Sequence, residues 1–451
     1  MINTKNEGLG KDISNISIVN TFHVIFITFT GVIPVGLFYG WGVLAHEIAL
    51  VFTPEDPYSF ANQHGIFVGA FVLFISSAPL FALQILIVDK AVVSEQFIHA
   101  LGLILIVLGL ILGFFSLQYK LLPLFYTGCL IFCGLGELCI FRRVLFHHQL
   151  YFKRIGLEKL GGGIFGFLIG VWTIIYFLIA EPLLKRMSVG FVLLVYALLM
   201  TISVSYPLMV INDNIANNEQ VCVNNDDVEM VEIKSVENVE NYEYVTLTLL
   251  EIIKIPQTWE LILFFAIVLT PGWGIKLGSI FILKQLFDVS TYYAECVSMI
   301  YLTSYAFGRL SALLAECFGV KRTYISFIIL MIVLLFLLPN VGSFGKEVFV
   351  IILCIIGFLY GGCKALFYSV VFDVFGAKNY RLAFSVSNIG FGIAVIIGVL
   401  TSAYSFSKNA SIDVGYIWFY SMGCSSSVAL IIVLFFLKPY NYSSHIKSDK
   451  K

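Results

Sequence analysis

Charged side chains are scarce in this sequence. Asp, Glu, Lys and Arg make up 12% of its 451 residues, whereas the apolar set AVILMFWYC makes up 59% and the mean hydropathy is +0.94. An ordinary soluble domain carries about 25% charged residues, so a chain this long could not cover its own surface in water. The scarcity excludes an ordinary soluble enzyme and indicates a protein that crosses a membrane many times.

Net charge and catalytic motifs are also lacking. With 27 basic and 28 acidic residues the formal net charge is −1, so no basic field is present that would attract nucleic acid. The sequence contains no HExxH, no GxSxG and no Cys/His constellation, and its nine cysteines lack zinc-finger or haem spacing. We therefore expect no enzymatic activity, no cofactor and no metal, and we interpret the cysteines as small apolar residues.

The apolar residues gather in runs long enough to cross a bilayer, which takes about 20 residues per helix. This length predicts twelve membrane spans, six before a polar gap and six after it. A cleavable signal sequence is not expected, because the first apolar run, from Phe22, is too long for one. The predicted spans are about 22–47, 64–88, 97–117, 122–141, 162–181, 189–211, 258–281, 293–314, 323–339, 348–370, 383–404 and 414–437.

The gap between the two sets of spans is acidic. Between Asn212 and Leu247 lie nine Asp and Glu residues and one basic residue, Lys234, a composition typical of a solvated, disordered linker. Docking of a cytoplasmic partner is the alternative interpretation. The expected fold is thus an all-α membrane protein with two pseudo-symmetric six-helix bundles. Its expected parts are an N-terminal tail (1–21), an N-terminal bundle (22–211), the linker (212–257), a C-terminal bundle (258–437) and a C-terminal tail (438–451).

Basic residues predict the orientation in the membrane. Lys and Arg collect in cytoplasmic loops, and with the N-terminus inside, the predicted cytoplasmic segments hold 18 of them and the outer loops 6. We therefore expect both termini to be cytoplasmic, in the plasma membrane or an organelle membrane, and the protein to be monomeric.

Two pairs of residues at one offset indicate an internal repeat. Asp89 and Glu316, which close the second and eighth spans, lie 227 positions apart, as do Glu137 and Lys364 in the fourth and tenth spans. The stretch from Gly308 to Arg322 resembles the loop motif G-x-L-a-D-r-x-G-r-R of the major facilitator superfamily, with Glu316 in place of Asp. The resemblance implies a cytoplasmic latch that changes partners when two bundles move against each other. The predicted latch residues are Asp89, Lys90, Glu316, Lys321 and Arg322.

Three further stretches resemble a branch of that superfamily. Residues 151–157, leading into a glycine-rich run, are similar to the segment between spans four and five of oxalate/formate antiporters and monocarboxylate transporters. Residues 249–259 resemble their entry into span seven. Residues 375–379 resemble an F-G-x-K-N turn that is shared with nodulin-like relatives. The resemblance implies transport of a small carboxylate.

Four ionisable residues fall inside predicted spans, where charge is costly and by default marks a substrate or ion path. They are Glu137, Lys276, Arg309 and Lys364. Arg309 is the strongest candidate, because its planar guanidinium can bind a carboxylate through two hydrogen bonds. The resemblance places it at the span-eight Arg that binds substrate carboxylate in the branch. A helix-end Arg that belongs to the latch or reaches the interface is the alternative, and for Lys276 outward snorkelling is the preferred interpretation.

The chain departs from the branch at three positions. Tyr305 stands where monocarboxylate transporters carry an Asp, Val43 where they carry a Lys, and Phe391 where oxalate antiporters carry a Lys. We expect Lys364 to supply the second positive charge, and Glu137 to pair with it or take up a proton. A purely structural Glu137–Lys364 ion pair is an equal alternative.

Tyr39 and Tyr305 complete the predicted substrate-binding set. Tyr39 lies in a glycine-rich part of the first span, where its ring could line the substrate path, although the glycines there also suit close helix packing. Tyr305 precedes Arg309 by one helical turn.

The predicted function is secondary active or facilitative transport of a small, monocarboxylate-like organic anion by alternating access, coupled to protons or as an exchanger. A facilitator of a neutral or amphoteric solute such as an amino acid, and a non-transporting membrane receptor, are the alternatives. The expected partners are the small-molecule substrate, a proton and the lipid bilayer.

Overall fold

Helices make up the regular structure of the chain. The computed structural model describes residues 18–40, 42–55, 93–211, 247–406 and 411–435, and these residues form helices without any strand. Ten stretches are long and apolar enough to cross a membrane, and they coincide with the third to twelfth predicted spans. The second predicted span (64–88) lies outside the described residues. The expected all-α fold of a multi-pass membrane protein is confirmed.

Four of the ten stretches lie in the N-terminal half and follow one another closely. They are α7 (Glu95–Tyr119), the continuous run of α8 (Leu122–Phe125), η2 (Tyr126–Phe132) and α9 (Cys133–Arg154), then α10 (Glu158–Leu184) and α11 (Val189–Val210). In the C-terminal half, a short helix α13 (Leu249–Lys254) leads into α14 (Pro256–Phe287). The others are α15 (Thr291–Gly308) with η3 (Arg309–Ser311) and α16 (Ala312–Phe318), α17 (Val320–Val341), η4 (Gly342–Phe344), α18 (Lys346–Ser405) and α19 (Ile412–Phe435).

The first span is divided into α2 (Ile18–Gly31), α3 (Ile33–Gly40) and α4 (Gly42–Phe52). The break at Val32 lies just before Pro34, which has no N–H to donate to the preceding turn. The Trp172 indole of α10 donates a 2.7 Å hydrogen bond to the carbonyl of Phe29 beside this break. A neighbouring helix, α10, thus supplies a hydrogen-bond donor to a carbonyl oxygen at the point where the first span is irregular.

The fourth span is longer than predicted, because α9 continues beyond residue 141 through two arginines to Arg154. Arg142 forms a 2.6 Å ion pair with Glu95 in the first turn of α7, and Arg143 donates a 2.6 Å hydrogen bond to the carbonyl of Ile211. Both arginines are buried. Pairing of this kind offsets the cost of burying a guanidinium, so the pair of arginines does not end the helix.

A single glycine separates the tenth and eleventh spans within α18. Gly376 has φ 69°, a backbone conformation that other residues adopt with difficulty. Asn379, in the same F-G-x-K-N turn, accepts a 2.8 Å hydrogen bond from the backbone N–H of Leu247, just before α13. The turn therefore joins the chain entering the C-terminal half to the start of the eleventh span.

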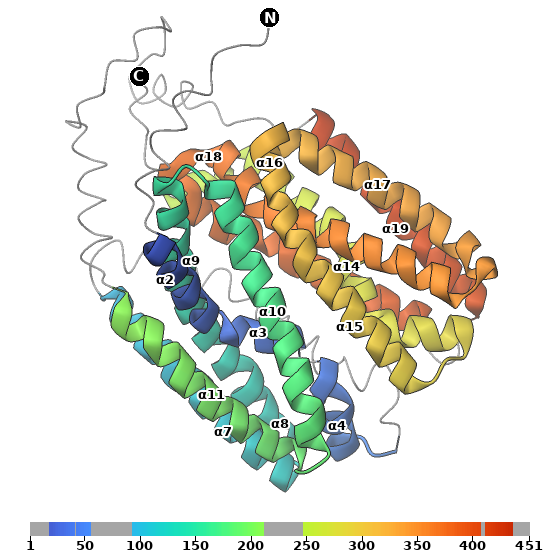
Figure 1. Cartoon of the computed structure of the whole chain (residues 1–451), viewed down its shortest axis with the longest axis horizontal. Coiled ribbons are helices and arrows are strands. Elements are labelled where there is room, and N and C mark those ends of the chain that lie inside the picture. Colours follow the sequence, from blue (N-terminus) through green and yellow to red (C-terminus); the bar gives the residue numbers. More distant parts are fainter. Residues whose placement is uncertain (1–17, 41, 56–92, 212–246, 407–410, 436–451) are drawn as a thin grey trace, which may run out of the picture.

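The helices form two groups. Figure 1 shows α2, α7, α9, α10 and α11 on one side and α14 to α19 on the other. In the described chain the principal contacts between the groups are made by α10, which packs against α15, η3, α16 and α18. Arg309, at the start of η3, lies at this interface, where it donates a hydrogen bond to the Gly166 carbonyl of α10.

Close packing of α7 on α9 is a testable feature of the N-terminal group. At Gly102 an added Cβ would meet the Gly136 carbonyl and Cys139 Cβ, both at 2.7 Å. We expect Gly102→Val to destabilise the protein by roughly 1–3 kcal/mol through overpacking, and to lower the melting temperature of the purified protein in detergent. Leu101→Val is the matched control, because Leu101 is 40% exposed on the same helix. Equal melting temperatures for the two variants would contradict this packing.

Candidate functional site

The four ionisable residues singled out above are all buried, and each lies near the middle of its span. Arg309 is 1% exposed, Glu137 3%, Lys276 5% and Lys364 7%. Lys364 interacts electrostatically with Arg309, Lys276 and Glu137. We call Lys276, Arg309 and Lys364 the cation cluster. Its members come from α14, η3 and α18, and the acidic residue that acts on it, Glu137, comes from α9.

Arg309 connects the two groups of helices. Its Nη1 donates a 2.5 Å hydrogen bond to the carbonyl of Gly166 in α10, and its Nη2 donates to the hydroxyl of Tyr305 one turn earlier. The guanidinium carbon also lies 4.6 Å from the centre of the Tyr305 ring. A side chain that snorkels to the interface would not be buried to this degree, so the structure does not support that alternative.

A glycine face on α10 makes room for this arginine. A Cβ at Gly166 would meet the Arg309 side chain at 2.8 Å, and a Cβ at Gly163 would meet the Arg309 carbonyl at 2.7 Å. Gly170, one turn further along, faces Ala306 of α15. The glycine-rich run, known from the sequence only as part of a family motif, thus lets a backbone carbonyl approach the guanidinium closely.

Lys364 lies against the residue that replaces the expected lysine. Its Nζ is 3.6 Å from the centre of the Phe391 ring and 5.3 Å from the Trp273 ring, distances at which an aromatic face attracts a cation. The ammonium group of Lys364 therefore lies beside the position where oxalate antiporters carry a lysine, but it comes from the tenth span and not from the eleventh.

Glu137 is the acidic member of the site. Its charge acts on Lys364, and its Oε2 is buried without a hydrogen-bond partner among the described residues. A carboxylate in this position can balance part of the cation cluster or exchange a proton. The two interpretations of the Glu137–Lys364 pair both remain compatible with this arrangement.

Lys276 does not snorkel outward, contrary to the preferred interpretation from the sequence. The side chain turns inward, where its Nζ lies 4.5 Å from the Trp273 ring centre and 5.7 Å from the Tyr305 ring centre. These two aromatic faces offer the ammonium a favourable site inside the protein. The face of α14 that carries Lys276 could not be identified from the sequence, because α14 is apolar on all sides.

Aromatic rings that sequence reasoning assigned no role surround the cation cluster. Trp273 is fully buried with its ring near both lysines, and Tyr360 of α18 stacks on Tyr305 with ring centres 5.1 Å apart. The only sequence signal for Trp273 was its place in the Pro-Gly-Trp-Gly stretch before Lys276. Tyr39, predicted to line the path, has a side chain that lies outside the described residues.

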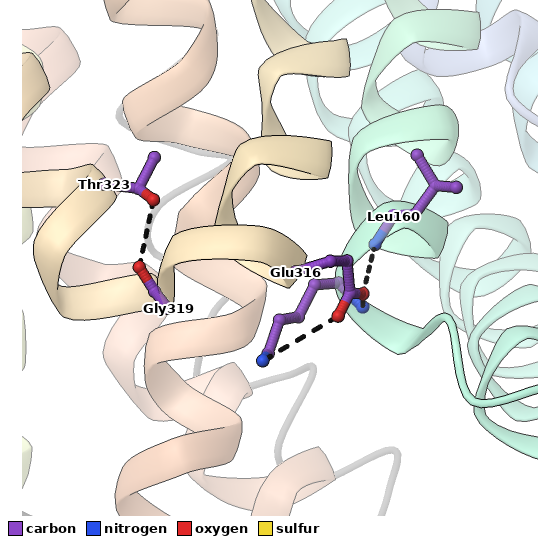
Figure 2. Close-up of polar contacts among 5 residues, drawn as sticks. Leu160, Glu316, Gly319 and Thr323 are labelled. Carbon is purple, nitrogen blue, oxygen red and sulfur yellow. Dashed lines mark hydrogen bonds and ion pairs between the residues drawn. The ribbon is translucent and has the colours of Figure 1, made fainter. Parts of the chain in front are cut away.

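The predicted latch residue Glu316 joins the two groups at one end of α10. Its Oε1 accepts hydrogen bonds from the backbone N–H groups of Lys159 (2.9 Å) and Leu160 (3.1 Å), and its Oε2 lies 3.8 Å from the Lys159 ammonium (Figure 2). The N-cap residue of α10, Leu157, has no capping side chain. Glu316 therefore supplies a cap from the other half, where the positive end of the helix dipole favours a carboxylate.

Gly319, the glycine of the same loop motif, has φ 85° and makes the turn into α17, and its carbonyl accepts a 3.0 Å hydrogen bond from the Thr323 hydroxyl (Figure 2). The remaining predicted latch residues differ in position. Lys321 donates a 3.4 Å hydrogen bond to the carbonyl of Leu434 in α19, and Arg322 is exposed. Asp89 and Lys90 lie outside the described residues. Within the described part of the chain, no group of His, Cys, Asp and Glu residues could hold a metal ion.

Solved structures share this architecture. Neither a family model nor a curated protein matches the sequence. The chain is similar to FucP, a major facilitator superfamily transporter in the outward conformation (TM-score 0.50, 16% identity, 90% of this chain and 98% of that chain). It is similar to a variant of the E. coli fucose:proton symporter FucP (0.51, 16%, 90% and 98%) and to the human organic anion transporter MFSD10 (0.65, 12%, 91% and 98%). The chain has the fold of these major facilitator transporters, and its membership of that superfamily and of a branch within it stays a prediction.

The cap on α10 can be tested by amide exchange. In Glu316→Ala the N–H groups of Lys159 and Leu160 lose their acceptor, at a cost of about 0.5–2 kcal/mol for a helix cap. We expect hydrogen exchange in the segment 157–163 to become several-fold faster. Glu347→Ala, which removes an acid from the first turn of α18, is the control and should leave this segment unchanged. Unaltered protection in Glu316→Ala would show that the carboxylate does not cap α10.

Proposed function

We propose that the chain is a transporter that moves a small organic anion across a membrane by alternating access. Its shared fold with solved transporters supports the class, and the substrate is inferred from the site. We further propose an N-terminal bundle (22–211) and a C-terminal bundle (258–437), joined by a cytoplasmic linker (212–257), with both termini cytoplasmic.

The buried cation cluster carries this proposal. In the part of the chain that the structure describes, three basic side chains and one acidic side chain are buried close together, and Lys364 is affected by the charges of the other three. Burying a charge in a region of low dielectric constant costs several kcal/mol. An anion that binds between these residues offsets that cost, whereas a neutral solute would not.

Arg309 is the proposed carboxylate-binding residue. In the described conformation its terminal nitrogens bond to the Gly166 carbonyl and the Tyr305 hydroxyl. A carboxylate can take the place of both acceptors, because it offers two oxygens to the planar guanidinium. Such an exchange would release the tie between α10 and η3, and it would thereby couple substrate binding to movement of the two halves.

Substitutions at two positions of the family pattern are compensated locally. Tyr305 replaces an acid, and its hydroxyl accepts a hydrogen bond from the arginine that the acid would have paired with. Lys364 places its ammonium at the Phe391 ring, where the branch carries lysine. The chemistry of an anion site is therefore retained with different residues, which supports the resemblance to carboxylate transporters.

Glu137 is the proposed proton-exchanging residue. Its buried carboxylate is close enough to Lys364 for their charges to interact, so a change in its protonation alters the charge of the site. Binding of a proton and of an anion would then reinforce each other. The latch contact between Glu316 and α10 is proposed to open and close in the same cycle.

A zwitterionic amino acid is the second candidate substrate. The presence of both signs of charge favours it, since Glu137 could bind an ammonium group while Arg309 binds a carboxylate. An uptake screen that includes monocarboxylates, dicarboxylates and amino acids separates the two candidates.

Substitution of Arg309 tests the proposed carboxylate-binding role. A hydrogen bond to a charged group contributes about 1.5–3 kcal/mol, which corresponds to roughly 10- to 100-fold in affinity. We expect Arg309→Gln in proteoliposomes to raise the KM for the transported anion by that factor, and Arg309→Lys to be intermediate. Arg186→Gln, at an exposed position, is the control. Unchanged uptake in Arg309→Gln would rule out the assignment.

Substitution of Glu137 tests proton coupling. Glu137→Gln keeps the size of the side chain but cannot release a proton. We expect it to lose accumulation driven by a pH gradient while exchange of internal for external substrate continues. The two modes are measured in the same proteoliposomes, with and without the gradient. Accumulation at the wild-type level would assign Glu137 a structural role.

A further inference from the structure

A single turn of 3-10 helix, η3 (Arg309–Ser311), lies within the eighth span, where two residues tie that span to α10. Arg309 begins this turn and donates to the Gly166 carbonyl, and Glu316 follows it in α16 and caps α10. A 3-10 turn has poorer hydrogen-bond geometry than an α-helix, so a stretch of it inside a helix needs support from its surroundings and often marks a hinge. The contacts around η3 show what supports it here.

The hydroxyl of Ser311 supports the turn from within. It donates a 2.5 Å hydrogen bond to the Gly308 carbonyl, and the side chain is buried. Gly308 is three residues earlier, and a 3-10 turn pairs residues at that spacing, so the hydroxyl favours the 3-10 form over the α-helical one. The hydroxyl lies on the side of α18, because a Cβ at Gly362 would meet the Ser311 Oγ at 2.5 Å. Ser311 therefore acts on η3 from the side of α18.

The helices on the two sides of η3 are held differently. Before it, α15 is fixed against α18, because a Cβ at Gly308 would overlap the Phe358 carbonyl. A Cβ at Gly361 would likewise overlap the Tyr305 carbonyl. After it, α16 has seven residues, and three of its large apolar side chains are exposed: Leu313, Leu314 and Phe318. A change of pitch in η3 therefore moves α16 and leaves α15 in place.

The size of that movement follows from helix geometry. Each residue advances by about 120° and 2.0 Å in a 3-10 helix, and by about 100° and 1.5 Å in an α-helix. Conversion of the three residues of η3 to α-helical pitch would therefore rotate α16 by roughly 60° and shorten the span by roughly 1.5 Å. Such a movement takes the Glu316 carboxylate away from the N–H groups of Lys159 and Leu160, which it contacts at 2.9 Å and 3.1 Å.

We propose that Ser311 is a positioning residue that keeps η3 in its 3-10 form, so that anion binding at Arg309 and the Glu316 cap on α10 oppose each other. The inference rests on the anion transport function proposed above. The Gly166 carbonyl holds Arg309 at the start of the turn, so an anion that releases the guanidinium removes one support of the 3-10 form. The turn then takes up α-helical pitch, and the Glu316 carboxylate leaves α10.

This opposition predicts the sign of a change in affinity. When two events are coupled in free energy, each acts on the other to the same extent. Loss of the Ser311 hydroxyl favours the α-helical form of η3, so it loosens the cap on α10 and strengthens anion binding at the same time. General damage to the fold would loosen the cap and weaken binding. The direction of the change in affinity therefore separates a positioning role from a merely structural one.

Hydrogen exchange tests the effect on the cap without any ligand. In Ser311→Ala we expect exchange in the segment 157–163 to become about 2- to 10-fold faster, as for the loss of one hydrogen bond, while α7 keeps its wild-type rates. Ser326→Ala, which removes a 3.0 Å hydroxyl bond to the Arg322 carbonyl in α17, is the matched control. Wild-type exchange in Ser311→Ala would overturn the proposal. If Ser311→Ala does not fold, Ser311→Cys, with a weaker donor of similar size, decides in the same way.

Uptake into proteoliposomes tests the link to binding, with lactate, succinate and alanine as the compounds offered. We expect the KM of Ser311→Ala for the transported compound to fall by about 2- to 10-fold, whereas Arg309→Gln raises it. A KM that is unchanged or raised in Ser311→Ala would overturn the coupling through η3 and leave the proposed transporter standing. Absence of uptake of all three compounds by the wild type would instead contradict the proposed function, and the exchange rates would still decide whether Ser311 controls the cap.

Discussion

The constraint on which the site depends is the burial of three basic side chains, Lys276, Arg309 and Lys364, near the carboxyl group of Glu137. Each ion taken out of water costs several kcal/mol unless its environment replaces the lost hydration. The protein supplies that environment in three forms: aromatic faces at Lys276 and Lys364, a hydroxyl and a backbone carbonyl at Arg309, and the carboxylate of Glu137. Three basic groups that are buried close together favour the binding of an anion, and this links the stability of the core to its proposed function.

The proposed function involves the interface between the two groups of helices. Helix α10 contacts the other half at two levels, through the Gly166 carbonyl that accepts from Arg309 and through the N-terminal amides that bond to Glu316. The glycine face of α10 is what brings the first of these contacts within reach. Both contacts are polar and can exchange partners. Apolar contacts also cross this interface, such as Phe167 on Phe307 with ring centres 5.4 Å apart, so the proposed cycle would have to separate both kinds.

Much of the fold could be predicted from the sequence, because the length of an apolar run is a strong and local signal. Ten spans appear where hydropathy placed them, and the break at Val32 and the extension of α9 through Arg142 and Arg143 were missed. Those features depend on tertiary partners: the Phe29 carbonyl beside the break accepts a hydrogen bond from Trp172 of α10, and Arg142 is stabilised by Glu95 from another helix. Run length cannot reveal such partners.

The residues of the candidate site could be predicted from the sequence, but the directions in which their side chains point could not. Arg309, Lys364 and Glu137 stood out as charges at membrane depth, and the structure brings them together. Lys276 was assigned to the interface because an apolar helix gives no signal of its rotation, and only the position of Trp273 shows that its ammonium points inward. The most direct measurement is an experimental structure of the protein saturated with an anion that it transports. Our account predicts the anionic group of the ligand at the Arg309 guanidinium, with the guanidinium released from the Gly166 carbonyl. A ligand bound elsewhere, with the Arg309 side chain unchanged, would contradict it.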